Sequence, residues 1–402
     1  MKKISVTLII FFIVLLVPIE VHGESEIDAF EVEEKVKFNI QSNVDSQLTM
    51  LDLSNIEDMY DSYSDVLSEI ANEQSLKGLI SQLTSGDTDI GVAEVLIMVA
   101  RLFFEQVTKN VPYIIMIIVI IALFSILNNL NPESSETQVM VITMYVQYIL
   151  IVSILSKVLI SCFNLGTTTI GSLADFTQNL FPVLAVLTTS MGGIASATVF
   201  TPILAFLTSF ITLMVKNTFL PMILILLVFA ILGNISDKVS VSNFSKMIKS
   251  FFKWGLGIIF VIFLGVIKIK GLVGSSFDGV SIKVTKYTIS KLVPYIGGAI
   301  SDTVDTVAVC SLLLKNAIGI TGLLIMFVII LKPVLNIAGC SLLIKLASSV
   351  LEPIAQKRVI LLLEDFSDIL TYLLILLIVV GAMFFVTIGL IIQAGNMNIM
   401  IR

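Results

Sequence analysis

The sequence has little charge and almost no histidine, and both shortages restrict the kind of protein it encodes. Charged residues make up 13% of the 402 residues, whereas soluble globular domains carry about 25%. Hydrophobic residues make up 56%, and the mean hydropathy is +1.02. Such a chain suits a lipid environment. The sequence therefore predicts an all-α, polytopic helical membrane protein with a small helical N-terminal extracytoplasmic domain.

The missing histidines also argue against an enzyme. The only histidine is His22, which lies in a segment that we expect to be removed. The mature chain would then lack any His-containing catalytic triad and any His-ligated metal site. The sequence also has no GxxxxGK[ST] loop for nucleotide phosphates. We therefore expect no enzymatic activity, no cofactor, and no catalytic or metal-binding residues.

Cysteines are scarce as well, and their positions do not suggest disulfides. Cys162, Cys310 and Cys340 all lie in apolar stretches, and none forms a CxxC motif. Such cysteines are typical of small buried residues. Residues 24–110 contain no cysteine, so the predicted N-terminal domain has no disulfide of its own.

The first 23 residues have the pattern of a secretory signal peptide. Lys2 and Lys3 precede an apolar run at residues 4–17, and Pro18 ends that run. We expect cleavage after Gly23, because small residues are preferred there. An uncleaved anchor helix is the alternative, although the run is shorter than the ~20 residues that a span needs.

Charge divides the remaining chain into two parts. Residues 24–110 contain 18 acidic and 5 basic residues, whereas residues 111–402 contain 11 acidic and 17 basic residues. We expect an acidic, mostly helical extracytoplasmic domain at 24–110 and a multi-pass transmembrane domain at 111–402. An acidic head disfavours nucleic acid, because nucleic-acid binding requires clustered lysine and arginine.

Apolar residues in the acidic domain recur at helical spacing from Ile56 to Ile70. Ser54 and Glu57 match a capping box at the start of this helix. The apolar stripe indicates a packing face, with a groove for a partner as the alternative. A second helix at residues 90–104 is apolar enough to lie on the membrane surface before the first span.

Long apolar runs predict the membrane spans. We expect six to eight crossings, with candidate spans at residues 111–127, 139–163, 219–232, 256–269, 317–335 and 369–392. Between two of them, residues 238–254 combine lysines with a stripe of bulky apolar residues, which predicts an interfacial helix. Membrane lipid is therefore an expected partner. Residues 283–296 form an amphipathic segment too polar to span.

One apolar region, at residues 180–215, contains helix breakers. Pro182, the Gly192-Gly193 pair and Pro202 disfavour a single helix. Half-helices or a re-entrant hairpin would suit this pattern, and irregular backbone at membrane depth is tolerated only where protein or water satisfies it. The region is therefore a candidate lining of an internal path. A kinked, packed helix is the alternative.

A second broken region is expected near residues 292–316. It begins at Pro294 and continues through Asp302 and Asp305 to Lys315 and Asn316.

Two lysines lie inside apolar membrane stretches, where a charge is costly. Lys315 and Lys345 would face either an internal polar path, a partner subunit or the membrane interface. Possible counter-charges are Asp302 and Asp305, or the acidic cluster Glu364, Asp365 and Asp368. We predict that Lys315 faces a path or a partner.

Several runs of residues together resemble the stage III sporulation protein AE family. They are GSLADFTQNLFP at 171–182, Gly192-Gly193 with Ala195 and Ala197, DGVSIK at 278–283, DTVD at 302–305, LLLKN at 312–316 and AGN at 394–396. The likeness covers essentially the whole chain. Its specificity comes from the number and order of these runs, because none has distinctive chemistry.

The resemblance implies a setting that the residues alone do not. It implies a multi-pass protein of the mother-cell membrane around the forespore, with the N-terminal domain in the intermembrane space. Implied partners are other stage III A sporulation proteins, including a companion ATPase and a ring-forming subunit, and indirectly a forespore-side partner. The implied role is a permease-like or export-platform component of a channel or secretion-like complex needed for late forespore gene expression. A non-conducting scaffold that anchors the ring and the ATPase is the alternative.

Overall fold

The computed structural model describes residues 43–393, except residues 45, 72–74, 86–90, 130–137, 236–240 and 274–296. These residues are almost entirely helical and contain no strand. The signal peptide, the segment at 283–296 and Pro294 lie outside the described residues, so the predictions for them stay predictions.

Long helices form the main body. They are α6 (Val92–Asn129), α7 (Gln138–Ser190), α8 (Ile194–Met214) continued by η1 (Val215–Phe219) and α9 (Leu220–Ile235), α10 (Ser242–Val273), α12 (Gly297–Leu351) and α13 (Lys357–Gln393). With α8, η1 and α9 taken together, the described residues hold 6 helices long and apolar enough to cross a membrane. The predicted all-α, multi-span fold is confirmed.

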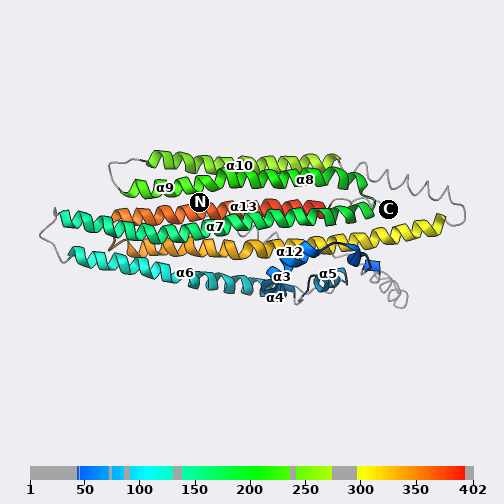
Figure 1. The fold of residues 1–402 in the computed structure, drawn as a ribbon, viewed down its shortest axis with the longest axis horizontal. Helices are drawn as coiled ribbons and strands as arrows, with labels where there is room; N and C mark the ends of the chain where they lie inside the picture. The colour runs from blue at the N-terminus through cyan, green and yellow to red at the C-terminus, as the bar shows by residue number, and fades with distance from the viewer. Residues whose placement is uncertain are drawn as a thin grey trace.

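The long helices lie side by side along one axis, as Figure 1 shows. α12 is central, because it packs against α13, α7 and α6. α10 forms one edge of the bundle and contacts mainly α9. The head helices α3 (Ser54–Ser62), α4 (Ser64–Ala71) and α5 (Leu76–Ser85) lie on the opposite side, near the start of α6.

Two helices are longer than a bilayer is thick. α7 has 53 residues and α12 has 55. At a rise of about 1.5 Å per residue each extends for about 80 Å, whereas the hydrocarbon core is about 30 Å thick. Much of the bundle therefore lies outside any single flat hydrocarbon layer.

Helices continue through several boundaries that the sequence suggests. The predicted surface helix at 90–104 and the first span are both parts of α6, which also crosses the expected domain boundary at residue 110. The predicted interfacial helix at 238–254 is likewise not separate, because α10 continues from Ser242 into the apolar run. In both cases an amphipathic segment contacts neighbouring helices. These contacts stabilise it as a continuation of the same helix.

The predicted breaks at prolines are also mostly absent. Pro182 lies within α7, and Pro202 lies within α8. The chain turns only at Met191-Gly192-Gly193. Gly192 has φ of 87°, which glycine adopts without steric cost. The Gly192 and Gly193 amides donate to the carbonyls of Thr189 (2.8 Å) and Thr188 (2.9 Å), and this pair of bonds is a Schellman motif.

The apolar stripe of the head is a packing face, as predicted. Ile56 and Tyr60 on α3 and Leu67 on α4 are buried, although the helix is interrupted at Tyr63. The predicted capping box is wrong. No side chain caps α3, and the Ser54 hydroxyl donates instead to Asp52 Oδ1 at 2.6 Å. This bond and the Ser54 amide lower the pKa of the Asp52 carboxyl.

Candidate functional site

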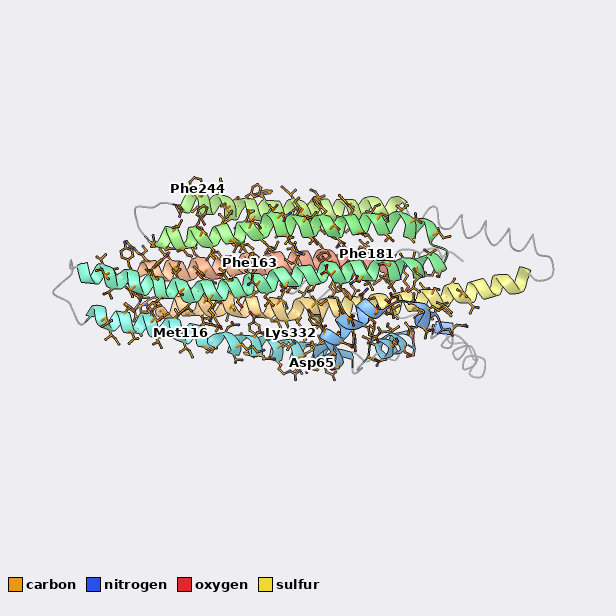
Figure 2. The ribbon with its side chains drawn as sticks, viewed as in Figure 1. Asp65, Met116, Phe163, Phe181, Phe244 and Lys332 are labelled. Atoms are coloured by element: carbon orange, nitrogen blue, oxygen red, sulfur yellow. The ribbon has the colours of Figure 1, made fainter. Side chains whose placement is uncertain are left out.

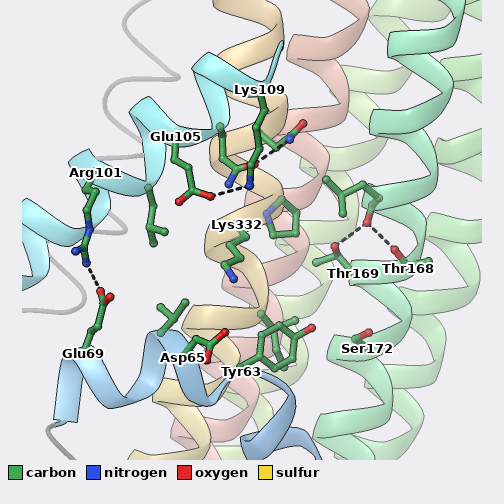
Figure 3. Close-up of a pocket in the computed structure, with 17 residues that line it drawn as sticks. Tyr63, Asp65, Glu69, Arg101, Glu105, Lys109, Thr168, Thr169, Ser172 and Lys332 are labelled. Atoms are coloured by element: carbon green, nitrogen blue, oxygen red, sulfur yellow. Dashed lines mark hydrogen bonds and ion pairs between the residues drawn. The ribbon is translucent and has the colours of Figure 1, made fainter. Parts of the chain in front are cut away.

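A polar recess lies where the head meets the bundle. It has a volume of about 700 Å³ and is lined by α4, α6, α7 and α12, together with Tyr63 between α3 and α4. Figure 3 shows it between the head helices and the faces of α6, α7 and α12. We refer to it as the head chamber.

Acidic and basic side chains line the head chamber in equal number. The acids are Asp65, Glu69 and Glu105, and the bases are Arg101, Lys109 and Lys332. Arg101 of α6 pairs with Glu69 of α4, which ties the head to the bundle. Lys109 pairs with Glu105 one turn away on α6, at 2.7 Å. Both pairs are largely exposed, so each contributes little to stability.

The wall formed by α12 carries a proline and a lysine. Pro333 lies inside the helix and has no amide hydrogen, so the carbonyl of Ile329 lacks its usual helical donor. Both residues line the chamber. Lys332 points toward the side on which Asp65 and Tyr63 lie (Figure 3). This wall therefore offers a backbone acceptor beside a cation.

Hydroxyl groups line the wall formed by α7. Thr168, Thr169 and Ser172 all border the chamber. Thr169 is buried, and its hydroxyl donates to the Leu165 carbonyl at 2.7 Å. On the head side, burial raises the pKa of the Tyr63 phenol. The phenol therefore stays neutral at physiological pH.

A chain of polar side chains continues from the chamber into the bundle. Asn336 donates to Gln106 Oε1 at 3.1 Å, and both residues line the chamber. The Cys162 and Cys340 thiols lie 3.9 and 3.7 Å from Asn336 Oδ1. The cysteines are buried and unbridged, as the sequence predicts, and they end this polar path at the apolar core.

The predicted residue Lys315 is fully buried within the first half of α12. The head reaches α12 one turn earlier, where Ser311 donates to Gln47 Oε1 at 3.1 Å. Asn316, the residue after Lys315, is half-buried. The burial places the Lys315 side chain inside the protein and not at a membrane interface, while its role in a path or interface stays a prediction.

The other predicted residues are dispersed. Lys345 is exposed on the outer face of α12, and Pro182 is exposed on α7. Gly192 and Gly193 form the turn after α7, away from the head chamber. Asp302 and Asp305 belong to α12, and their side chains lie outside the described part. The structure therefore does not gather the predicted set into one site.

A second charged cluster involves a lysine that the sequence analysis did not single out. Lys249 of α10 lies 3.2 Å from Asp365 and 3.8 Å from Asp368, both on α13. Asn234 of α9 donates to the other oxygen of Asp365 at 3.0 Å. Asp365 and Asp368 lie three residues apart, and this spacing could have predicted a basic side chain nearby. Nothing in the sequence identifies α10 as the helix that supplies it.

Among the described residues, no group of three or more His, Cys, Asp or Glu side chains could hold a metal ion. The head chamber is lined by charges of both signs and by hydroxyl-bearing side chains. It is suited to binding a polar or mixed-charge segment, or to holding water.

Comparison with known proteins identifies relatives of this chain. A family model described as Stage III sporulation protein AE matches residues 74–395. Stage III sporulation protein AE of Bacillus subtilis (strain 168) is 30% identical over 239 residues, which are 60% of this chain and 60% of that protein. The aligned part therefore spans less than two thirds of that relative. No solved structure matches this chain.

Proposed function

Because the chain belongs to the stage III sporulation protein AE family, we propose that it is a multi-pass membrane subunit of the stage III A channel or secretion-like complex between mother cell and forespore. In this proposal it lies in the mother-cell membrane around the forespore, with its head in the intermembrane space. Its partners are other stage III A proteins, including the companion ATPase and the ring-forming subunit, and indirectly a forespore-side protein. The proposal includes no enzymatic activity.

Within that complex, the chain acts as a permease-like or export-platform component. The observation that supports this role is the head chamber, a polar recess of about 700 Å³ between the head and the helix bundle. The chamber opens beside the head, where material bound for or from the intermembrane space would pass.

A substitution that fills the chamber tests this role. Ser172 lines the chamber, whereas Asn179 is exposed on the same helix and is not among the lining residues. We expect Ser172→Trp to abolish late forespore gene expression while the protein still accumulates and copurifies with its partners. Asn179→Trp should leave expression unchanged. Normal expression with Ser172→Trp would argue against conduction through the chamber.

A non-conducting scaffold is the second candidate, and the packing of the central helices favours it. A Cβ atom on Gly322 of α12 would lie 2.7 Å from Leu180 of α7, and one on Gly319 would lie 2.6 Å from Ile392 Cδ1 of α13. Such close packing leaves no open path between these helices. In a scaffold, the head chamber would receive a segment of a partner, and Ser172→Trp would then reduce copurification of that partner.

A further inference from the structure

The head chamber contains an acid and a base that the ion pairs described above do not use. They are Asp65 of α4 and Lys332 of α12. In the described part of the chain, neither side chain takes part in an ion pair. Lys332 also lies near Glu105, but that carboxylate is paired with Lys109 at 2.7 Å. One negative and one positive group therefore remain for a ligand in the chamber.

These two charged residues belong to different walls of the chamber. Asp65 lies on the head, Lys332 lies on the central helix of the bundle, and Lys332 points toward the side on which Asp65 lies (Figure 3). Both residues are exposed, and both line the recess of about 700 Å³. A ligand with a positive group at one end and a negative group at the other would therefore contact both walls at once.

The walls formed by α7 and α12 offer hydrogen-bond acceptors. The hydroxyls of Thr168 and Thr169 donate to carbonyls within α7 at 3.0 and 2.7 Å. Because a hydroxyl has one hydrogen and two lone pairs, both oxygens can only accept a further bond. On α12, the carbonyl of Ile329 lacks its usual helical donor because of Pro333. These walls therefore suit a ligand that carries N–H groups between its charged ends.

A short peptide with free ends has this combination of groups. Its amino terminus is an ammonium, its carboxyl terminus is a carboxylate, and its amides supply N–H donors. The apolar lining residues Val66, Leu102 and Leu165 offer contacts for small apolar side chains. The volume of about 700 Å³ also lies within the range of about 300–1,000 Å³ that is typical of small-ligand sites.

We propose that the head chamber binds a short peptide with free ends, with its ammonium at Asp65 and its carboxylate at Lys332. This inference rests on the proposed function, because it names the class of substrate that the chamber would take. Hydrogen bonds between ionised groups are stronger than those between neutral groups. The two ends of the peptide therefore supply most of the selectivity, and the hydroxyl and carbonyl acceptors bind its amides.

Binding of trialanine to the full-length protein in detergent tests the proposal. Equilibrium dialysis would compare radiolabelled trialanine with N-acetyl-trialanine, which lacks the ammonium, and with trialanine amide, which lacks the carboxylate. We expect trialanine to bind about tenfold more tightly than either blocked form, because each blocked form loses one hydrogen bond between charged groups. Free alanine, which has no amide N–H, should bind more weakly than trialanine.

Two variants should change this selectivity in opposite ways. Asp65→Asn should lose the preference for trialanine over N-acetyl-trialanine and keep the preference over trialanine amide. Lys332→Gln should do the reverse, and a protein that merely misfolds would show neither pattern. Asp58→Asn and Lys345→Gln are the controls, because both residues are exposed and neither lines the chamber. Both controls should keep the two preferences.

Three results would overturn the proposal. They are no binding of trialanine, equal binding of trialanine and its two blocked forms, and binding of free alanine as tight as that of trialanine. The Ser172→Trp test remains separate from these results. Loss of gene expression in Ser172→Trp without trialanine binding would mean that the chamber takes another substrate. Trialanine binding with normal expression in Ser172→Trp would instead argue against conduction and leave the peptide site standing.

Discussion

At the scale of single residues, the central helices are held at a distance that only glycine allows. A Cβ atom on Gly319 of α12 would lie 2.6 Å from Ile392 Cδ1 and too close to Ile392 Cγ1 as well. Because Cγ1 is near the backbone of α13, rotation of the isoleucine end does not relieve the clash. Overpacking of this kind costs about 1–3 kcal/mol.

We therefore expect Gly319→Ala to lower the free energy of unfolding of the detergent-solubilised protein by about 1–3 kcal/mol. Ile392→Ala should restore part of that loss in the double variant, since it removes the clashing atoms. Gly389→Ala is the control, because a Cβ atom there would have nothing within 4 Å. A Gly319→Ala protein as stable as the Gly389→Ala protein would show that the helices move apart freely.

Lys315 presents the opposite case, a residue whose charge is costly to bury. It is fully buried, whereas Lys345 on the same helix is exposed. Burying an ammonium costs free energy of desolvation, whereas an apolar side chain of similar volume does not carry this cost. A lysine kept at this position for stability alone would therefore be dispensable.

We expect Lys315→Met to accumulate in the membrane at normal levels but to reduce heat-resistant spores severely. Lys345→Met should sporulate normally, because its charge lies on the outer face. Spore counts beside an immunoblot of the membrane fraction would measure both variants. Normal sporulation with Lys315→Met would exclude a role for the ammonium in a path or a partner contact.

At the scale of helices, the sequence predicts the existence of the spans better than their ends. All six predicted apolar runs lie in helices that qualify as spans. The sequence did not predict the helix ends correctly where a polar segment continues the helix. Examples are α6 before residue 110 and α10 before Trp254. Those segments remain helical because tertiary contacts decide, and local propensity is a weak guide there.

Proline was the least reliable signal for the end of a helix. The free-energy cost of a proline inside a helix depends on what surrounds the carbonyl that loses its amide donor. Pro182, Pro202 and Pro333 all lie within helices. Pro333 contributes to the head chamber, which the sequence analysis did not predict at all. The chamber combines residues from four helices and from Tyr63 between α3 and α4. No spacing rule in the sequence brings Asp65 near Lys332.

The pairing of Lys249 with Asp365 is the main polar contact that holds α10 to the bundle. Lys249 is 20% exposed and Asp365 is 35% exposed, so solvent screens the pair only in part. Removal of one partner leaves the other partly buried charge without compensation.

We expect Lys249→Met to lower the free energy of unfolding by about 1–2 kcal/mol, a value discounted for partial exposure. The double variant Lys249→Met/Asp365→Asn should recover part of that loss, because it leaves no lone charge. Thermal unfolding in detergent would measure both proteins. If the double variant is less stable than Lys249→Met alone, the loss reflects packing and not charge.

At the scale of the whole molecule, the outward residues of α6 and α7 indicate where lipid ends. On α6, the exposed residues from Ile115 to Leu127 are apolar, and Met116 projects outward in Figure 2. On α7, the exposed residues are apolar from Val141 to Leu150, and most are polar from Ser153 to Asn179. On α7, the outward residues are therefore more polar on the side of the head chamber than at the opposite end.

This change predicts which part of α7 meets water. A cysteine at exposed Ile149 should lie in hydrocarbon and resist a membrane-impermeant maleimide. A cysteine at exposed Asp175 should react, because it lies on the head side of the boundary. The three native cysteines are buried, so the unmodified protein supplies a low background.

The same labelling tests orientation, which neither the helices nor the sequence relationship reveals. If the head is extracytoplasmic, Asp175→Cys should react in intact cells when reagent is added from outside. Reaction only after the cells are broken would place the head and its chamber in the cytoplasm, and export through the chamber would then have to begin at the head. Equal reaction of Ile149→Cys and Asp175→Cys would instead place the lipid boundary elsewhere on α7.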